Sequence, residues 1–163
     1  MSRRTLAELE LLWKRLGRDL ELGWAGPAGA FDDADLVTRT AYRGTSRTTD
    51  LGAVEEVAAA RQLLVNRLKT RRGELAALGH PDYGSRHHEL IGEPNTERTR
   101  NLVKLYVLEA LNREPRIQKV LSCDVTTPER PRDVVRITLD LRLVDQPNPL
   151  NLVIPFDLAG GST

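Results

Sequence analysis

Regular alternation of apolar and polar residues in the last third of the chain constrains the fold most strongly. Residues 135–143 carry an apolar side chain at every second position, with Arg, Thr and Asp between them. Because successive side chains of a strand point to opposite faces of a sheet, this spacing predicts a strand with one buried and one solvated face. The apolar members are Val135, Ile137, Leu139, Leu141 and Leu143.

The same alternation returns after the turn at residues 146–149 and predicts a final strand. Its apolar members are Leu150, Leu152, Ile154, Phe156 and Leu158. Pro155 lies within this strand and cannot donate to a ladder, so the strand is expected at an edge of the sheet. We expect strand-edge contacts with a partner at Leu150, Leu152, Ile154 and Phe156. The alternative, that Pro155 blunts this edge against any pairing, stays open.

The middle of the chain predicts helices that cover this sheet. Residues 96–112 have amphipathic helical spacing with a cap at Asn95 or Thr96, and residues 116–125 read as a strand. A second helix is expected after an N-cap at Asp50. Its core stripe would comprise Val54, Val57, Ala58, Leu64, Val65 and Leu68. A short helix over residues 86–91 would follow a tight turn at residues 79–84.

The first fifty residues predict less regular structure. Residues 5–16 have helical spacing, residues 18–22 suggest a brief extended piece, and residues 24–35 form a Gly-, Pro- and Asp-rich loop. Residues 36–42 favour a strand, whereas residues 44–50 look polar and irregular. The fold class is therefore α+β, with helices packed on one face of a small, mostly antiparallel β-sheet and with C-terminal β-strands.

Length and charge limit the classes of protein to which the chain can belong. We expect one compact domain, made of an N-terminal segment over residues 1–50, an α+β domain over 51–158 and a disordered tail over 159–163. With 24 Lys and Arg against 23 Asp and Glu, the net charge of +1 argues against broad nucleic-acid binding. The single cysteine, Cys123, is expected to be a buried apolar residue. The start of the chain is no secretory signal and no stretch could span a bilayer, so a cytoplasmic location without membrane contact is expected.

Candidate residues for metal binding and catalysis have unfavourable spacing. His87 and His88 are adjacent and would point about 100° apart on a helix, so we expect no metal site, with one of the three histidines packed and two exposed. Paired carboxylates for glycoside hydrolysis could come from Glu89, Glu93, Glu109 and Glu114. The chain has only two Phe, two Trp and three Tyr to stack on sugars. No nucleophile elbow, phosphate loop or dinucleotide motif occurs, so the residues give no positive case for an enzyme or a cofactor.

One rigid corner is a better candidate for a functional site. Proline disfavours helical geometry in the preceding residue, so the helix should stop by Glu114. Pro115 then leads into extended chain, where Glu114 and Arg116 project to the same side. Glu114 would lie at the negative end of the helix dipole, and Arg116 or a partner's arginine would compensate it. The corner is thus either a local salt bridge or a partner-binding site formed by Glu114, Pro115 and Arg116.

Three segments together carry a resemblance to a known family. They are Asn66-Arg67-Leu68-Lys69-Thr70-Arg71-Arg72-Gly73-Glu74-Leu75, then His80-Pro81-Asp82-Tyr83-Gly84, and then Glu109-Ala110-Leu111-Asn112-Arg113-Glu114-Pro115-Arg116-Ile117. In this order they resemble the small baseplate wedge protein, or sheath initiator, of contractile phage tails, a family sometimes labelled lysozyme-like. Relatives occur in type VI secretion baseplates and in extracellular contractile injection particles. The resemblance covers about residues 51–158.

The resemblance implies a structural role in a ring assembly of many copies. The Glu-Pro-Arg corner would contact the larger wedge proteins, and the C-terminal sheet would offer strand edges to the first ring of sheath subunits. Tube or spike-hub proteins are further expected partners. The subunit would be made in the cytoplasm and then become part of the tail or injection particle. The alternative function is a tail-associated, peptidoglycan-cleaving enzyme; a third possibility is an unrelated cytosolic interaction module.

Overall fold

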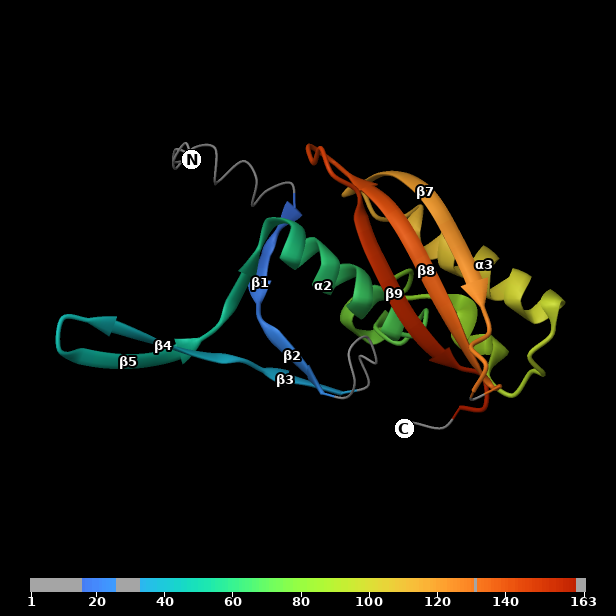
Figure 1. The fold of residues 1–163 in the computed structure, drawn as a ribbon, viewed down its shortest axis with the longest axis horizontal. Coiled ribbons are helices and arrows are strands. Elements are labelled where there is room, and N and C mark those ends of the chain that lie inside the picture. Colours follow the sequence, from blue (N-terminus) through green and yellow to red (C-terminus); the bar gives the residue numbers. More distant parts are fainter. Residues whose placement is uncertain (1–15, 26–32, 131, 161–163) are drawn as a thin grey trace.

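The computed structural model describes residues 16–25, 33–130 and 132–160. Its body is a three-stranded antiparallel sheet in the order β7-β8-β9, with bounds Ile117–Thr126, Val134–Leu143 and Leu150–Asp157. Helices α2 (Glu56–Lys69) and α3 (Glu97–Leu111) pack on one face of this sheet (Figure 1). The predicted α+β class with helices on one face is confirmed.

The core lies between the helices and the inner face of the sheet. Every apolar residue of the predicted alternation in β8 and β9 is buried there, and Cys123 joins them from β7. Pro155 lies opposite Arg136 of the middle strand, and β9 is an edge strand as predicted. Helix α3 begins as expected, because the Thr96 hydroxyl accepts a hydrogen bond from the Thr99 backbone N–H at 3.2 Å.

The outer face of the sheet is polar and joined across its strands. Asp140 on β8 accepts hydrogen bonds from the Ser122 hydroxyl of β7 at 2.9 Å and from the Asn151 amide of β9 at 2.8 Å. Arg136 and Arg142 are exposed on the same strand. This face therefore stays open to solvent while the other carries the core.

The described part of the N-terminal segment forms three two-stranded ribbons. Of the predicted loop over residues 24–35, both ends belong to strands, and residues 26–32 lie outside the described residues. Strand β1 (Arg18–Leu20) pairs with β6 (Ala53–Glu55), β2 (Leu22–Ala25) with β3 (Asp33–Leu36), and β4 (Thr38–Arg43) with β5 (Ser46–Leu51). Figure 1 shows the β4–β5 ribbon, here called the hairpin arm, extending away from the body. Every described side chain of β4 and β5 is exposed, including Tyr42 at 72%.

The three ribbons meet at a ring of backbone hydrogen bonds. The Glu21 N–H donates to the Gly52 carbonyl, the Gly52 N–H to the Val37 carbonyl, and the Val37 N–H to the Glu21 carbonyl, at 2.7–3.0 Å. A Cβ atom at Gly52 would lie 3.1 Å from the Val37 carbonyl oxygen and 2.6 Å from a Glu21 carboxylate oxygen, so glycine suits this close approach of the backbones. Buried Gln62 of α2 joins this junction to the body by accepting from the Leu22 N–H and donating to the Leu20 carbonyl.

Two predictions about this region were wrong. Residues 44–50 are not irregular, since Ser46–Leu51 form β5. Asp50 is not a helix cap, because it lies in β5 opposite Arg39 of β4. Its carboxylate accepts a hydrogen bond from the Leu51 backbone N–H. Helix α2 begins only at Glu56, since Val54 is held in β6 opposite Asp19 of β1. Strand pairing with a distant segment has overridden the local helical pattern.

The buried stripe of α2 also differs from the prediction in its first half. Leu64, Val65 and Leu68 are buried as expected, but Ala58 is exposed, whereas Ala59, Ala60 and Gln62 are buried. Ala59, Ala60 and Gln62 thus take the place of Ala58 on the buried face of the first turns.

Two short 3-10 helices, η1 (Ala76–Leu78) and η2 (Arg86–Leu90), follow α2 and flank the predicted turn. The predicted helix over residues 5–16 lies outside the described residues except for Leu16, which is buried in the core. Among the described residues, no helix has the length and apolar character that crossing a membrane requires.

Candidate functional site

The predicted corner lies where α3 ends and β7 begins. The helix stops at Leu111 with Asn112 as its C-cap, and Glu114 and Arg116 face each other across Pro115. The Glu114 Oε1 atom accepts from the Arg116 Nη1 group at 3.0 Å and from the Arg116 backbone N–H at 3.2 Å. The predicted compensation of Glu114 by Arg116 is confirmed.

A second arginine, which the sequence did not single out, completes this bond network. Arg67 of α2 donates from Nη2 to the other oxygen of Glu114 at 3.1 Å. The Arg67 guanidinium also lies over the Tyr83 ring, 4.7 Å from its centre. Burial raises the pKa of the Tyr83 phenol, so this ring is neutral at neutral pH. We call Arg67, Tyr83, Glu114 and Arg116 the inner cluster.

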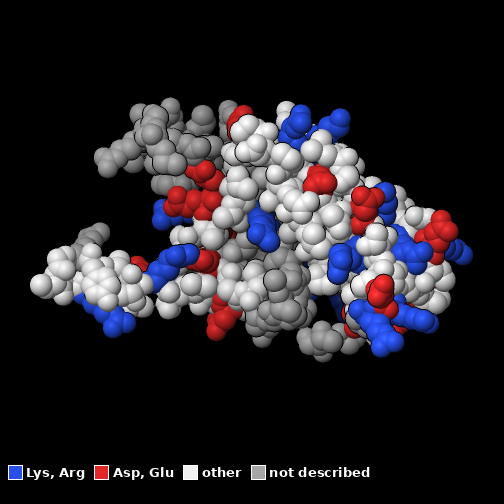
Figure 2. All heavy atoms as spheres, in the orientation of Figure 1, with Lys and Arg blue, Asp and Glu red and all other residues white. Residues whose placement is uncertain are grey.

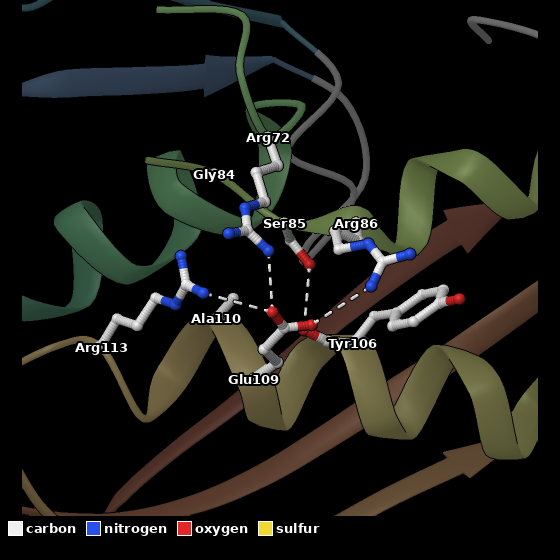
Figure 3. A pocket seen from close by; sticks show the side chains of 8 residues that line it. All are labelled: Arg72, Gly84, Ser85, Arg86, Tyr106, Glu109, Ala110 and Arg113. Atoms are coloured by element: carbon white, nitrogen blue, oxygen red, sulfur yellow. Dashed lines mark hydrogen bonds and ion pairs between the residues drawn. The ribbon is translucent and has the colours of Figure 1, made fainter. Parts of the chain in front are cut away.

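A second group of charges, the outer cluster, lies nearer the surface. Arg72 and Arg113 each donate to Asp82, at 2.8 and 2.9 Å, and to Glu109, at 2.8 and 3.3 Å. Figure 3 shows these two arginines converging on Glu109 together with Arg86, whose Nη1 lies 3.8 Å from the carboxylate. Hydrogen bonds from Arg72 and Arg113 hold the pKa of Asp82 below its usual range.

A close backbone contact joins the end of the first of the three segments to the end of the second. The Ser85 N–H donates to the Thr70 carbonyl, and the Arg72 N–H donates to the Ser85 carbonyl. Gly84 has a φ of +96°, and a Cβ atom there would lie 2.6 Å from the Thr70 oxygen. Only glycine allows the turn at residues 79–84 to lie against the end of α2.

Each cluster draws a residue from all three segments that carry the resemblance. Arg67 and Arg72 come from the first and Tyr83 and Asp82 from the second, whereas Glu109, Arg113, Glu114 and Arg116 come from the third. Arg86 joins the outer cluster from outside these segments. The segments are therefore parts of a single tertiary arrangement. Nothing in the periodicity pointed to Arg67; its place inside the first segment was the only signal that could have found it.

The corner exposes its members unequally. The Glu114 side chain is 1% exposed, whereas Pro115 is exposed and the Arg116 side chain is 28% exposed. Both oxygens of Glu114 are engaged by arginines of its own chain. A partner at this corner would therefore meet Pro115 and Arg116, with Glu114 acting from behind as a positioning residue.

The four residues expected to make strand-edge contacts have side chains that are not available to a partner. The side chains of β9 at these positions are buried at 9% exposure or less; they are Leu150, Leu152, Ile154 and Phe156. Contact with a partner strand would therefore use the main chain of β9, while the side chains stay in the core.

The histidines are packed more than the sequence predicted. One packed and two exposed histidines were predicted. His87 is buried and His80 is exposed, but His88 is half-buried. The Nε2 atom of His88 donates a hydrogen bond to the Leu68 carbonyl at 2.9 Å. His87 stacks on His88 and meets the Phe156 ring edge-on, and burial lowers the pKa of His87 to about 3. Among the described residues, no three His, Cys, Asp or Glu side chains are placed to hold a metal ion.

Three of the four glutamates considered for glycoside hydrolysis are engaged by arginines, and Glu89 and Glu109 both contact Arg86. Glu114 is enclosed by the inner cluster, and Glu109 contacts three arginines of the outer cluster. Glu89 is held by a forked hydrogen bond from Arg86, which lowers the pKa of Glu89. Glu93 is exposed in the linker before α3.

The visible surface carries mixed charge. Figure 2 shows Lys and Arg interspersed with Asp and Glu over the body, in keeping with the net charge of +1.

Comparison with known proteins identifies a family and related solved structures. A family model described as baseplate wedge protein gp25 matches residues 54–148. No curated protein matches the chain. The crystal structure of a Geobacter sulfurreducens protein, which carries the provisional name tail lysozyme, is similar with a TM-score of 0.52 and 28% identity. The match covers 60% of this chain and 86% of that one.

Proposed function

The chain belongs to the family of baseplate wedge protein gp25, and from this membership we propose that it is a non-enzymatic subunit that links wedge proteins and starts sheath assembly. The family match supports a structural role in the baseplate of a phage tail, with other baseplate components as partners. The linking and initiating roles are the proposal. Its setting would be a contractile tail or injection particle, assembled in the cytoplasm.

The observation that carries the proposal is the inner cluster. A carboxylate that is 1% exposed holds Arg116 in place behind the exposed Pro115. Rigid positioning lowers the entropy that a docking side chain loses on binding. The cluster also joins α2, the turn at residues 79–84 and the start of β7, so a force applied at the corner is spread over the whole body.

The sheet supplies the second half of the proposal. The edge strand β9 leaves main-chain groups on its outer side unpaired within the described residues, because the sheet ends there. Its side chains anchor it to the core, so the edge is a stiff template for a strand from a sheath subunit. Pro155 removes one donor from the strand and would help to set the register of such pairing.

The test is assembly with Arg116→Ala. The isolated variant should remain folded, because Glu114 keeps Arg67, and the lost charged hydrogen bond costs about 1.5–3 kcal/mol. In a producing strain it should fail to form baseplates, as judged by electron microscopy. Arg98→Ala, which removes an exposed arginine from α3, is the matched control and should assemble normally. Normal particles from Arg116→Ala would refute the docking role.

The name of the Geobacter protein keeps peptidoglycan cleavage as a second candidate function. Purified protein incubated with cell-wall polymer would release reducing ends if the chain were such an enzyme. Release by the wild type, with loss in both Glu109→Gln and Glu114→Gln and retention in Glu93→Gln, would favour cleavage over a structural role.

A further inference from the structure

The inner cluster holds two arginines for a single carboxylate. Glu114 pairs with Arg67 at 3.1 Å and with Arg116 at 3.0 Å, and no other carboxylate among the described residues pairs with either arginine. Tyr83 packs on Arg67 through its neutral ring and adds no negative charge. The cluster therefore retains one positive charge although it is largely removed from water, an arrangement that is unfavourable without a further partner.

The hydrogen bonds of the two arginines also show that the cluster lacks acceptors. Arg67 donates to Glu114 only through Nη2, and Arg116 only through Nη1 among its side-chain groups. The Nε atoms of both arginines are buried and have no hydrogen-bond partner among the described residues. Buried polar groups in folded proteins are almost always paired, so these two exceptions show that Glu114 alone does not satisfy the donors of the two guanidinium groups.

The open side of the cluster is at Arg116. Its side chain is 28% exposed next to exposed Pro115, whereas the Arg67 side chain is 11% exposed. A Cβ atom at Gly17 would lie 3.7 Å from the Nη2 atom of Arg116, so the lack of a side chain there keeps this part of the guanidinium uncovered. Gly17 has a φ of +95°, a conformation that favours glycine.

We propose that the Nη2 side of Arg116 binds an Asp or Glu carboxylate of a neighbouring baseplate protein. This inference rests on the proposed function and specifies its chemistry. The incoming carboxylate would neutralise the remaining charge and accept from the free Nη2 group, giving Arg116 one carboxylate on each side. An acidic side chain fits better than a backbone carbonyl, because a carbonyl would leave the excess charge in place.

A zero-length cross-link tests the partner's chemistry. In assembled particles carrying Arg116→Lys, a carbodiimide would activate a carboxylate in contact with the new amine. The amine displaces the activating group as a urea and forms an amide, with net loss of water. Mass spectrometry should find the peptide of position 116 joined to an Asp or Glu of another subunit, and this product should be absent from wild-type particles, because the guanidinium of Arg116 forms no such amide.

The outcomes separate the two proposals. If particles contain the chain but position 116 joins only acidic residues of its own chain, or none, the carboxylate proposal is wrong while docking at the corner can stand. If purified particles lack the chain altogether, the proposed function fails first. Should Arg116→Lys block assembly, a cryo-EM structure of wild-type particles decides, since a neighbour's carboxylate within 4 Å of Nη2 supports the proposal and a carbonyl or solvent there overturns it.

Discussion

The body and the hairpin arm differ in what stabilises them. In the body, buried side chains from α2, α3 and all three strands of the main sheet form one core, and the two charged clusters join its surface segments. In the hairpin arm, every described side chain of β4 and β5 is exposed. The family match at residues 54–148 includes most of the body and leaves the hairpin arm out.

This difference shows where the hairpin arm gets its order. An isolated two-stranded ribbon is marginally stable in water. The hairpin arm is held at its base by the hydrogen-bond ring of Glu21, Val37 and Gly52 and by the forked pair of Arg39 with Glu21 at 2.6 Å. Substitutions in the body should therefore change global stability, whereas substitutions toward the arm's tip should barely change it.

The largest effect is expected at the centre of the inner cluster. Glu114→Ala would leave Arg67 and Arg116 without a counter-charge in a buried setting, which typically costs about 3–5 kcal/mol of unfolding free energy. Urea denaturation followed by circular dichroism measures this loss. Glu93→Ala is the control, because Glu93 is exposed, and should change stability by less than about 0.5 kcal/mol. Equal, small effects for both variants would contradict the role given to the inner cluster.

Gly84→Ala should have the next largest effect. The positive φ costs a non-glycine residue about 1–2 kcal/mol, and the added methyl group would overlap backbone atoms of Thr70 and Arg71, for a total of about 2–4 kcal/mol. Gly73→Ala separates the two causes, since Gly73 also has a positive φ but no atom within 4 Å of its would-be Cβ. Thermal unfolding should rank Gly84→Ala as clearly worse; the reverse order would argue against the close contact.

His87 should make the body sensitive to acid. Its pKa is about 3 in the folded chain and 6.5 when unfolded, so the unfolded state binds the extra proton between these values. Stability from this group is complete above pH 6.5 and falls by about 1.4 kcal/mol per pH unit as the pH drops toward 3. His87→Gln should reduce the dependence of the unfolding free energy on pH between pH 6 and 5. The dependence that remains would come from His88, because burial lowers the pKa of His88 as well.

His80→Gln is the matched control for that measurement. His80 is exposed and should leave the slope as it is in the wild type. A wild-type slope that His87→Gln does not change would show that this histidine is accessible to protons in the folded state.

The smallest effect is expected at the tip of the hairpin arm. Tyr42→Ala removes a side chain that is 72% exposed and should change the unfolding free energy by less than about 0.5 kcal/mol. Hydrogen exchange should show arm amides opening long before those of β8. A loss above about 2 kcal/mol in the isolated chain would mean that the hairpin arm packs against the body in solution.

The C-terminal sheet and α3 could be predicted because their signals are local. Alternation in β8 and β9 identified the buried positions, Pro155 placed β9 at an edge, and Thr96 capped α3. The late start of α2 and strand β5 could not be predicted in this way. The late start of α2 depends on the pairing of Val54 with the distant Asp19, and local spacing carries no record of such a partner. Strand β5 pairs with the neighbouring β4, but its side chains are all exposed, so no apolar alternation marked it as a strand.

The candidate site also has features that follow from local sequence and features that depend on tertiary packing. The sequence by itself determined that the chain turns sharply at Pro115 with Glu114 and Arg116 on one side, because proline geometry acts on its immediate neighbours. Only the tertiary structure decided that Glu114 is buried and that Arg67, 47 residues away, shares it. Burial and charge balance depend on which elements pack together in space, and that information becomes available only when the whole chain has folded.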